Sequence, residues 1–489
     1  MVVEHPRYFS IYSSGKPAPG DDTSDAREGS PALPPSPLHP RRPPGLAAIR
    51  ARFPALLDGW ALMENAGGSQ APASVSDAVR QHMRRSFCQL GAGYPASDRA
   101  VAVVDSAHAV LKTIMGVEPT PFGTGGEVIL GGSSTQLLTT LAACFRDSDF
   151  LLPGDDVVIH RASHEANVGP WVRLAERRGA TVRWWGFHTD DRDAADPGSL
   201  DALREALTPR TKIVAACHAS NLLGAVVNLP AAVGIIREAA SSACQIIVDG
   251  VAYAPHRAMS VSDWGVDWYC FSPYKTFGPH AGALFGSDRG LAAVKGPNHY
   301  FVDPRDNPYK HELGGGLAHE LCAGIVAMGG YLRWLSGAAG EEQGEEETRG
   351  DDDFGLEGGR ALNRADVLVA FDRVRALEEA PARRAMEALV SLRDRWAIRI
   401  LGPACSDATV RVPTMSFFPT SANVSPSDVA AAAREDSVAI RNGNMYGVRL
   451  CEDLGIEAGE GVVRVSLAHY NTEDEVERLV LALERVFAE

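Results

Sequence analysis

The chain has 489 residues, a formal net charge of −15 at pH 7, and 45% hydrophobic against 22% charged residues. This length allows one large domain and a smaller one, because single cores stop growing at about 250–300 residues. The acidic balance argues against a nucleic-acid or anionic-membrane surface, so we expect no nucleic acid and no membrane partner.

The eight cysteines are dispersed singly, with no CxxC pair and no Cys/His cluster at zinc spacing. We therefore expect no metal site and a reducing compartment. The sequence has no apolar run of about 18 residues, and its N-terminus lacks the apolar core of a signal peptide. These features together predict a cytoplasmic protein.

Two segments have the composition of solvated chain. Residues 1–45 are rich in Pro, Gly, Ser and charge, which predicts a disordered tail. Residues 336–359 form an acidic, Gly-rich stretch, which predicts a solvated loop insertion, with an acidic docking site as the alternative. The remaining chain divides into a large domain at 46–335, including an N-terminal arm, and a small C-terminal domain at 360–489.

Between these two segments, short β-branched runs alternate with helix-like stretches. The runs are EVILGG, DVVIHR, ATVRWWGF, KIVAACHA, QIIVDG, WYCFS and GALFG. Continuous apolar strands separated by helices predict an α/β domain with a mainly parallel sheet covered on both faces.

The pattern changes after the acidic stretch. A long helical segment (Arg360–Asp394) precedes strand-like TMSFFPTS and GVVRVSLAHY, and a final helix opens with a capping box at Thr472 and Glu475. This order predicts a smaller α+β domain.

An aspartate and a lysine raise the functional question. Asp249 ends the run QIIVD, at the end of a strand where open α/β sheets bind ligands. Lys275 lies in a Ser-Pro-Tyr-Lys turn between two apolar runs, where a lysine is either a costly buried charge or a Schiff-base amine. A helix cap or loop turn is the alternative for Asp249. The pair together fits pyridoxal 5'-phosphate, with the aspartate on the pyridinium nitrogen.

The phosphate of such a cofactor needs an anion site. The stretch GGSSTQLLTTL, which contains Ser133, Ser134 and Thr135, places glycines and hydroxyls at the start of a helix that follows a strand. Ser272, near Lys275, is a candidate for a second phosphate contact.

These stretches, with SHEANVGPW, CHASNLLGAVVNL and VRVSLAHYNTEDEVERL, resemble the class V aminotransferase family of fold type I, most closely its cysteine-desulfurase-like branch. The resemblance runs from about Arg52 to the C-terminus without the acidic stretch. It implies a large domain with a mainly parallel sheet, a small α+β domain, pyridoxal 5'-phosphate as cofactor and an amino acid as substrate.

The resemblance also implies residue roles. Lys275 is the Schiff-base lysine that moves the Cα proton, and Asp249 holds the pyridinium nitrogen. His164 is the candidate for stacking on the cofactor ring, although it lies one position out of the family's register, and a core or surface histidine is the alternative. Asn221 and Arg464 are the residues that bind the substrate carboxylate. For Arg464, the alternative is a position on the outward face of a strand.

Two departures from the family bear on the reaction. Ala252 stands where the desulfurases have a glutamine. The loop IRNGNMYGVRLCEDL keeps Arg441, a further candidate substrate contact, but has Tyr446 where they carry a nucleophilic cysteine. A tyrosine cannot form the persulfide of a desulfurase. Cys451, five residues further on, lies in an apolar helix-like run and is expected to pack rather than react.

We therefore expect an enzyme that forms an aldimine with an amino acid and cleaves a C–S or C–Se bond as a β-lyase. The alternatives are an aminotransferase, an epimerase, decomposition of an acidic amino-acid side chain, a persulfide-forming desulfurase, and a catalytically silent scaffold. The resemblance further implies a homodimer, with ELGGG (Glu312–Gly316) reaching the partner's phosphate pocket.

Overall fold

The computed structural model describes residues 43–121, 123–186, 198–303, 308–315, 318–338, 361–396, 398–421, 423–457 and 459–488. Residues 1–42 of the predicted tail and residues 339–359 of the predicted insertion lie outside the described residues. Within the described part of the chain, no helix has the length and apolar character needed to span a membrane.

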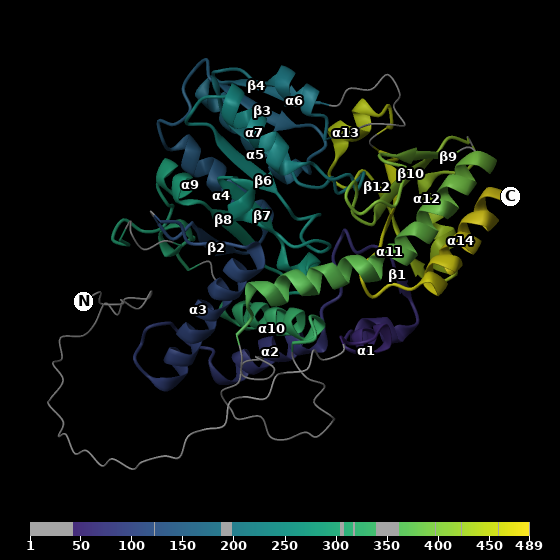
Figure 1. Cartoon of the computed structure of the whole chain (residues 1–489), viewed down its shortest axis with the longest axis horizontal. Coiled ribbons are helices and arrows are strands. Elements are labelled where there is room, and N and C mark those ends of the chain that lie inside the picture. Colours follow the sequence, from purple (N-terminus) through teal and green to yellow (C-terminus); the bar gives the residue numbers. More distant parts are fainter. Residues whose placement is uncertain are drawn as a thin grey trace, which may run out of the picture.

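A seven-stranded sheet forms the centre of the large unit (Figure 1). Its strands, in spatial order, are β2 (Glu127–Gly131), β8 (Gly282–Gly286), β7 (Trp268–Phe271), β6 (Gln245–Asp249), β5 (Thr211–Cys217), β3 (Asp156–His160) and β4 (Thr181–Trp185). The strand β8 runs antiparallel to both of its neighbours, and the other pairs are parallel. The mainly parallel α/β sheet predicted from the alternating runs is confirmed, and each predicted run forms a strand.

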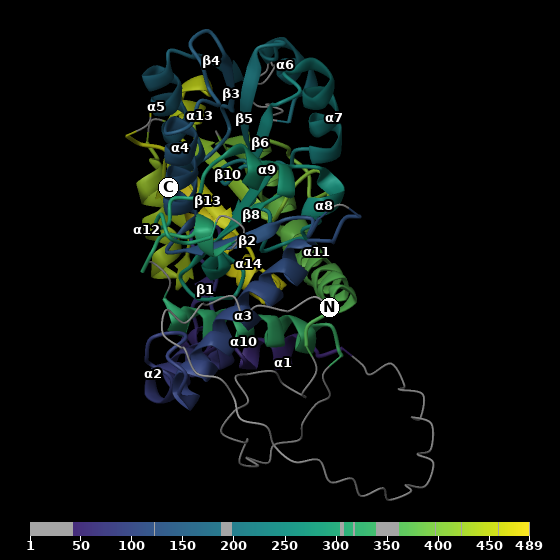
Figure 2. The same ribbon diagram turned by 90° about the vertical axis from the view of Figure 1, so that its left-hand side faces the viewer.

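Helices cover both faces of this sheet, as the side view in Figure 2 shows, with α4 and α5 on one face and α6, α7 and α8 on the other. Successive residues of β6 alternate between the two cores, because side chains of a strand point to opposite faces. Ile246 and Val248 join the core under α7, whereas Ile247 joins the core under α4. The helices of the large unit are α1 (Leu46–Ala51), α2 (Ala73–Arg85), α3 (Pro95–Met115), α4 (Ser134–Arg146), α5 (Gly169–Arg178), α6 (Leu200–Ala206), α7 (Leu229–Ala239), α8 (Val261–Trp264), α9 (Asp288–Ala293) and α10 (His319–Leu335).

The small unit is a four-stranded antiparallel sheet packed on helices, and α11 extends from it along the large unit (Figure 1). Its elements are α11 (Arg364–Arg395), β9 (Ile398–Leu401), β10 (Thr414–Pro419), α12 (Pro426–Glu435), β12 (Arg441–Gly443), α13 (Val448–Asp453), β13 (Val462–Ser466) and α14 (Glu473–Ala488). The capping box at the start of α14 is confirmed: the Glu475 amide donates to Thr472 Oγ1, and the Thr472 amide donates to Glu475 Oε2.

The N-terminal segment connects the two units. Its short strand β1 (Ala61–Leu62) pairs in parallel with β11 (Val438–Ala439) of the small unit. Beyond β1, Glu64 forms an isolated parallel bridge with Ser466, at the end of β13. The arm assigned from sequence to the large domain therefore forms its strand contact with the C-terminal part of the chain.

One close backbone approach fixes the start of α4 against the sheet. A Cβ on Gly282 would lie 2.4 Å from the carbonyl carbon of Ser133 and 2.7 Å from the amide nitrogen of Ser134. Only glycine lets β8 pass this close to the turn, because real Cβ atoms essentially never lie within 3.0 Å of such an atom.

We expect Gly282→Ala to destabilise the protein by about 1–3 kcal/mol, because backbone must move to admit the methyl group. Gly234→Ala in α7 is the matched control: its Cβ would meet nothing within 4 Å, so it should be neutral or stabilising by about 0.5–1 kcal/mol. Urea unfolding of both variants measures the difference. Equal stability of the two would contradict the close approach.

Candidate active site

The candidate site lies where several strands of the large sheet end together. Asp249 is the last residue of β6, and in register it faces Cys217 of β5 and Cys270 of β7. The turn to α4 follows β2, and Ser272 follows β7. Ligands bind at this edge of open α/β sheets because the loops after the strands meet there.

A pocket opens at this edge, and seven of the predicted site residues line it. The lining comprises Ser134, Thr135, His164, Ala166, Cys217, Ala219, Asn221, Asp249, Val251, Ala252, Ser272, Tyr274 and Lys275. Asp249 at the end of β6 and Lys275 in the turn after β7 therefore share one cavity.

Lys275 ends a 3-10 turn (Pro273–Lys275) whose geometry follows from the proline at its first position. Its side chain is buried, with 9% of the residue exposed. Burial and the Arg464 guanidinium lower the pKa of Lys275 to about 8, against the opposing pull of Asp249 and Glu64. The neutral fraction of this amine near neutral pH is therefore much larger than for a lysine of ordinary pKa, as a nucleophilic lysine requires.

Asp249 is buried, and its Oδ1 accepts a hydrogen bond from the Val251 amide at 2.9 Å. Burial raises its pKa, while the Val251 amide and Lys275 act in the opposite direction. The carboxylate thus has one oxygen held by backbone, and a cationic partner in the pocket stabilises its ionised form.

Hydroxyl groups gather at the first turn of α4. Ser134 Oγ lies 2.8 Å from Ser272 Oγ, so the turn before α4 and the loop after β7 meet side by side. Thr135 lines the pocket as well, whereas Ser133 caps the helix by accepting from the Gln136 amide and is not among the described lining residues. The helix N-terminus and these hydroxyls provide donors for an anion.

His164 lines the pocket, and Tyr446, which is not among the described lining residues, lies against His164. Their rings lie 4.9 Å apart, and His164 Nδ1 accepts a hydrogen bond from the Ala166 amide. Burial, Lys275 and Arg464 lower the pKa of His164 to about 4, so its ring is neutral near pH 7. Met445 and Tyr446 both have positive φ, at 50° and 60°. Two consecutive non-glycine residues in this region indicate local strain in the loop that places the exposed Tyr446 beside His164.

The small unit contributes two arginines beside the pocket. Arg464 of β13 is 3% exposed and donates to the Asn221 carbonyl oxygen at 3.2 Å, and its register partner on β12 is Arg441. Burial lowers the pKa of Arg464 to about 10, while Glu64 opposes this shift. Sequence reasoning missed Glu64, whose carboxylate contacts both arginines. The only local sign of Glu64 in the sequence is its position: it is an acidic residue two positions after a short apolar strand and three positions before Gly67.

The thiols near the site are poor nucleophiles. Cys217, which the sequence reading also missed as a lining residue, is buried, and its pKa is raised to about 12 by burial and by Asp249. Cys451 is fully buried in α13 among Leu450, Leu454 and other apolar side chains, and burial raises its pKa to about 11. The expectation that Cys451 packs in the core is confirmed.

Comparisons with known proteins agree with the geometry of this pocket. The family model for class V aminotransferases matches residues 61–350 and 364–479. The chain is 33% identical over 445 residues to the aminotransferase-like protein FGM3 of Gibberella zeae, covering 90% of this chain and 97% of that one. It is 25% identical over 456 residues to the cysteine desulfurase CsdA of Escherichia coli, covering 90% and 97%.

Solved structures share the fold. The crystal structure of Escherichia coli CsdA in its S-sulfonic acid form matches with a TM-score of 0.67 at 24% identity, over 91% of this chain and 98% of that one. The apo cysteine desulfurase of Thermococcus onnurineus matches with a TM-score of 0.72 at 20% identity, over the same shares.

The chain is therefore a member of the class V aminotransferase family, within its cysteine-desulfurase-like branch. It is a pyridoxal-phosphate-dependent enzyme, because this family uses that cofactor. The residues present fit the cofactor: one pocket holds a buried amine of lowered pKa, a buried carboxylate, and hydroxyls at a helix N-terminus.

Burial of Lys275 makes a stability prediction. Its pKa in the folded chain, about 8, lies below the ordinary value of 10.5, so the folded state binds fewer protons between these two values. The penalty for burying the ammonium is full below pH 8 and disappears as the pH rises toward 10.5. Lys275→Met should therefore stabilise the apoprotein at pH 7 by up to about 3 kcal/mol, with a gain that shrinks above pH 8.

Urea unfolding at pH 7, 8, 9 and 10 without cofactor measures this gain, and Lys295→Met, at an exposed position, is the control. A gain of the same size at pH 7 and pH 10 would show that the lysine charge is not the cause.

Proposed function

We propose that the protein is a β-lyase that cleaves the C–S or C–Se bond of a cysteine-derived amino acid. The observation that carries this proposal is a base in the pocket without a reactive thiol beside it. Lys275 has a lowered pKa, whereas the pKa values of Cys217 and Cys451 are raised and Tyr446 occupies the exposed loop position.

In this proposal the large unit holds the cofactor. Asp249 would pair with the ring nitrogen and favour its protonated form, and the neutral ring of His164 would stack on the cofactor ring. Ser134, Thr135 and Ser272 would donate to the phosphate at the start of α4. When bound, the cofactor supplies an electron sink for the carbon that bears the amino group.

The substrate-binding groups come from the other side of the pocket. Arg464 and Asn221 bind the substrate carboxylate in this proposal. A planar guanidinium suits this role because it can make two parallel bonds to a carboxylate. Arg441, beside Arg464, and Tyr446, beside His164, are the further substrate contacts in this proposal. This places the substrate's Cα between the arginines and Lys275.

The reaction then needs one proton transfer from carbon. The Lys275 Nζ takes the Cα proton, the Cβ–S bond breaks, and the sulfur leaves with the bonding electron pair as a thiolate. Water releases the remaining three carbons as pyruvate and ammonia. No protein thiol takes part, which agrees with the raised pKa values of the cysteines near the site.

Transamination is the second candidate, favoured by the printed name of the 33% identical relative, an aminotransferase-like protein. It shares the lysine and the carboxylate-binding arginine, and it differs only in the fate of the substrate after Cα loses its proton.

We expect the purified protein to release pyruvate from cysteine conjugates or cysteine sulfoxides, measured with a coupled pyruvate assay. Lys275→Ala should lower the rate by about 10²–10⁴-fold and remove the yellow colour of the bound cofactor, whereas Lys295→Ala should change neither. Exchange of amino groups with a keto acid, without pyruvate, would replace the lyase by an aminotransferase.

We also propose a homodimer in the cytoplasm. All eight cysteines are free thiols, which suits a reducing compartment, and Tyr300 and Phe301 are 96% and 61% exposed, more than expected for large side chains that face only water. The described part of ELGGG is held within its own chain, because the buried Glu312 pairs with His108, while Gly316 lies outside the described residues.

Sedimentation of the purified protein should give twice the chain mass of 52.1 kDa. The double variant Tyr300→Asp, Phe301→Asp should shift the equilibrium toward one chain, because two charges would be buried in an interface. A single-chain mass for the parent protein at micromolar concentration would exclude the dimer.

A further inference from the structure

The carboxylate of Glu64 forms ion pairs with two arginines beside the site, Arg441 and Arg464. Its Oε1 atom lies 3.3 Å from Arg441 Nη1 and 3.3 Å from Arg464 Nη2, so one oxygen bridges two guanidinium groups. Glu64 also acts on the pocket itself, because its charge raises the pKa of both Lys275 and Tyr274.

The backbone of the N-terminal segment positions Glu64 beside the arginines. The backbone of Glu64 bridges Ser466, two residues beyond Arg464, and the Asn65 amide donates to the Ser466 carbonyl oxygen. A Cβ on Gly67 would lie 2.1 Å from Glu64 Oε1, so the carboxylate lies in the space that the missing side chain leaves.

The side chains of Arg464 and Glu64 differ in how freely they can move. The side chain of Arg464 is 3% exposed, extends from the central strand pair of the small sheet and is tied to the Asn221 carbonyl oxygen. The side chain of Glu64 is 34% exposed and can rotate into solvent. An incoming anion can therefore replace Glu64 without moving the arginine, and it keeps the buried guanidinium paired.

We propose that Glu64 is an internal competitor of the substrate carboxylate, which must displace it from Arg464 and Arg441. The proposal rests on the proposed function, in which Arg464 binds that carboxylate. It restricts the substrate class to amino acids with a free carboxylate, because an ester, an amide or a peptide-bound residue has no negative charge with which to replace Glu64.

Propionate tests this directly, because it carries the carboxylate but no amine and no sulfur. Its dissociation constant is measured by calorimetry on the cofactor-loaded protein. Glu64→Gln should bind propionate on the order of tenfold more tightly, because the binding-competent fraction of the arginine pair is no longer reduced by an attached charge. Propionate should also raise the melting temperature of Glu64→Gln more than that of the parent protein.

Glu64→Asp provides a second variant should the glutamine variant fail to fold. Its shorter side chain cannot bridge both arginines in the same way, so it should bind propionate with an intermediate dissociation constant. Arg464→Gln should abolish propionate binding with either residue at position 64.

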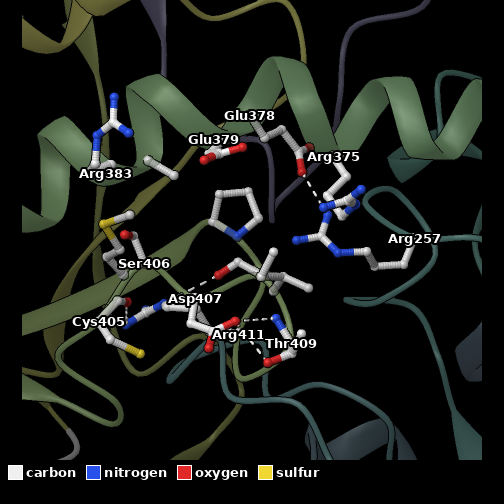
Figure 3. Close-up of a pocket in the computed structure, with 15 residues that line it drawn as sticks. Arg257, Arg375, Glu378, Glu379, Arg383, Cys405, Ser406, Asp407, Thr409 and Arg411 are labelled. Atoms are coloured by element: carbon white, nitrogen blue, oxygen red, sulfur yellow. Dashed lines mark hydrogen bonds and ion pairs between the residues drawn. The ribbon is translucent and has the colours of Figure 1, made fainter.

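A second cavity lined by arginines makes a matched control necessary. This cavity, of about 460 Å³, lies between α11 and the segment before β10, and Figure 3 shows Arg257, Arg375 and Arg383 around it together with Glu379. Glu379→Gln removes one exposed negative charge there. It should leave the dissociation constant of propionate within about twofold of the parent value, because Glu379 lines the other cavity and solvent screens an exposed charge.

The outcomes separate this proposal from the proposed function. Loss of binding in Arg464→Gln, with unchanged or weaker binding in Glu64→Gln and Glu64→Asp, overturns the competitor role alone. Unchanged binding in Arg464→Gln overturns the carboxylate-binding role of Arg464 and the competitor role with it. Equal tightening in Glu379→Gln also overturns the competitor role, whereas absence of pyruvate from cysteine derivatives does not affect it.

Discussion

The buried amine of Lys275 is the constraint on which the site depends. An ammonium taken out of water must be neutralised or paired, and here it lies in one cavity with Asp249 while Arg464 repels it. The result is a lysine with a pKa of about 8. The sheet makes this possible, because β6 and β7 end side by side and their loops bring the two groups into the same pocket.

Charged groups on the small-unit side of the pocket act on this amine in opposite directions. Arg464 and Arg441 come from neighbouring strands of the small sheet, and the N-terminal segment supplies Glu64 between them. Three parts of the chain therefore meet at the pocket: the strand ends of the large unit, the small sheet, and the segment after β1. The single carboxylate shared by two arginines leaves this side positive, which suits an anionic group of a substrate.

At the loop position where the resemblance to desulfurases implies a nucleophilic cysteine, the chain has Tyr446. Tyr446 is exposed, strained at φ 60° and placed against His164, while Cys451 is buried in α13. A thiolate nucleophile needs exposure and a positive field, and a thiol in an apolar core has neither. The proposed function therefore assigns the chemistry of the pocket to proton transfer by Lys275 and not to a protein thiol.

Much of this protein could be derived from local patterns in the sequence. The apolar runs predicted each strand of the large sheet, because a strand buried on both faces has no polar alternation. Asp249 and Lys275 could be selected as site residues because burying a charge beside a strand costs free energy unless the charge is paired or functional. The capping box of α14 was equally local, since both of its hydrogen bonds join residues three positions apart.

Other features were decided only by the tertiary structure. The pairing of β1 with β11, and the contact of Glu64 with Arg464, join positions about four hundred residues apart. No periodicity carries such a contact, because it depends on how the two units pack and on the space above Gly67. The pKa of Lys275 belongs to the same class: the sequence determined that a lysine follows β7, and its burial beside Arg464 in the folded chain lowers that pKa.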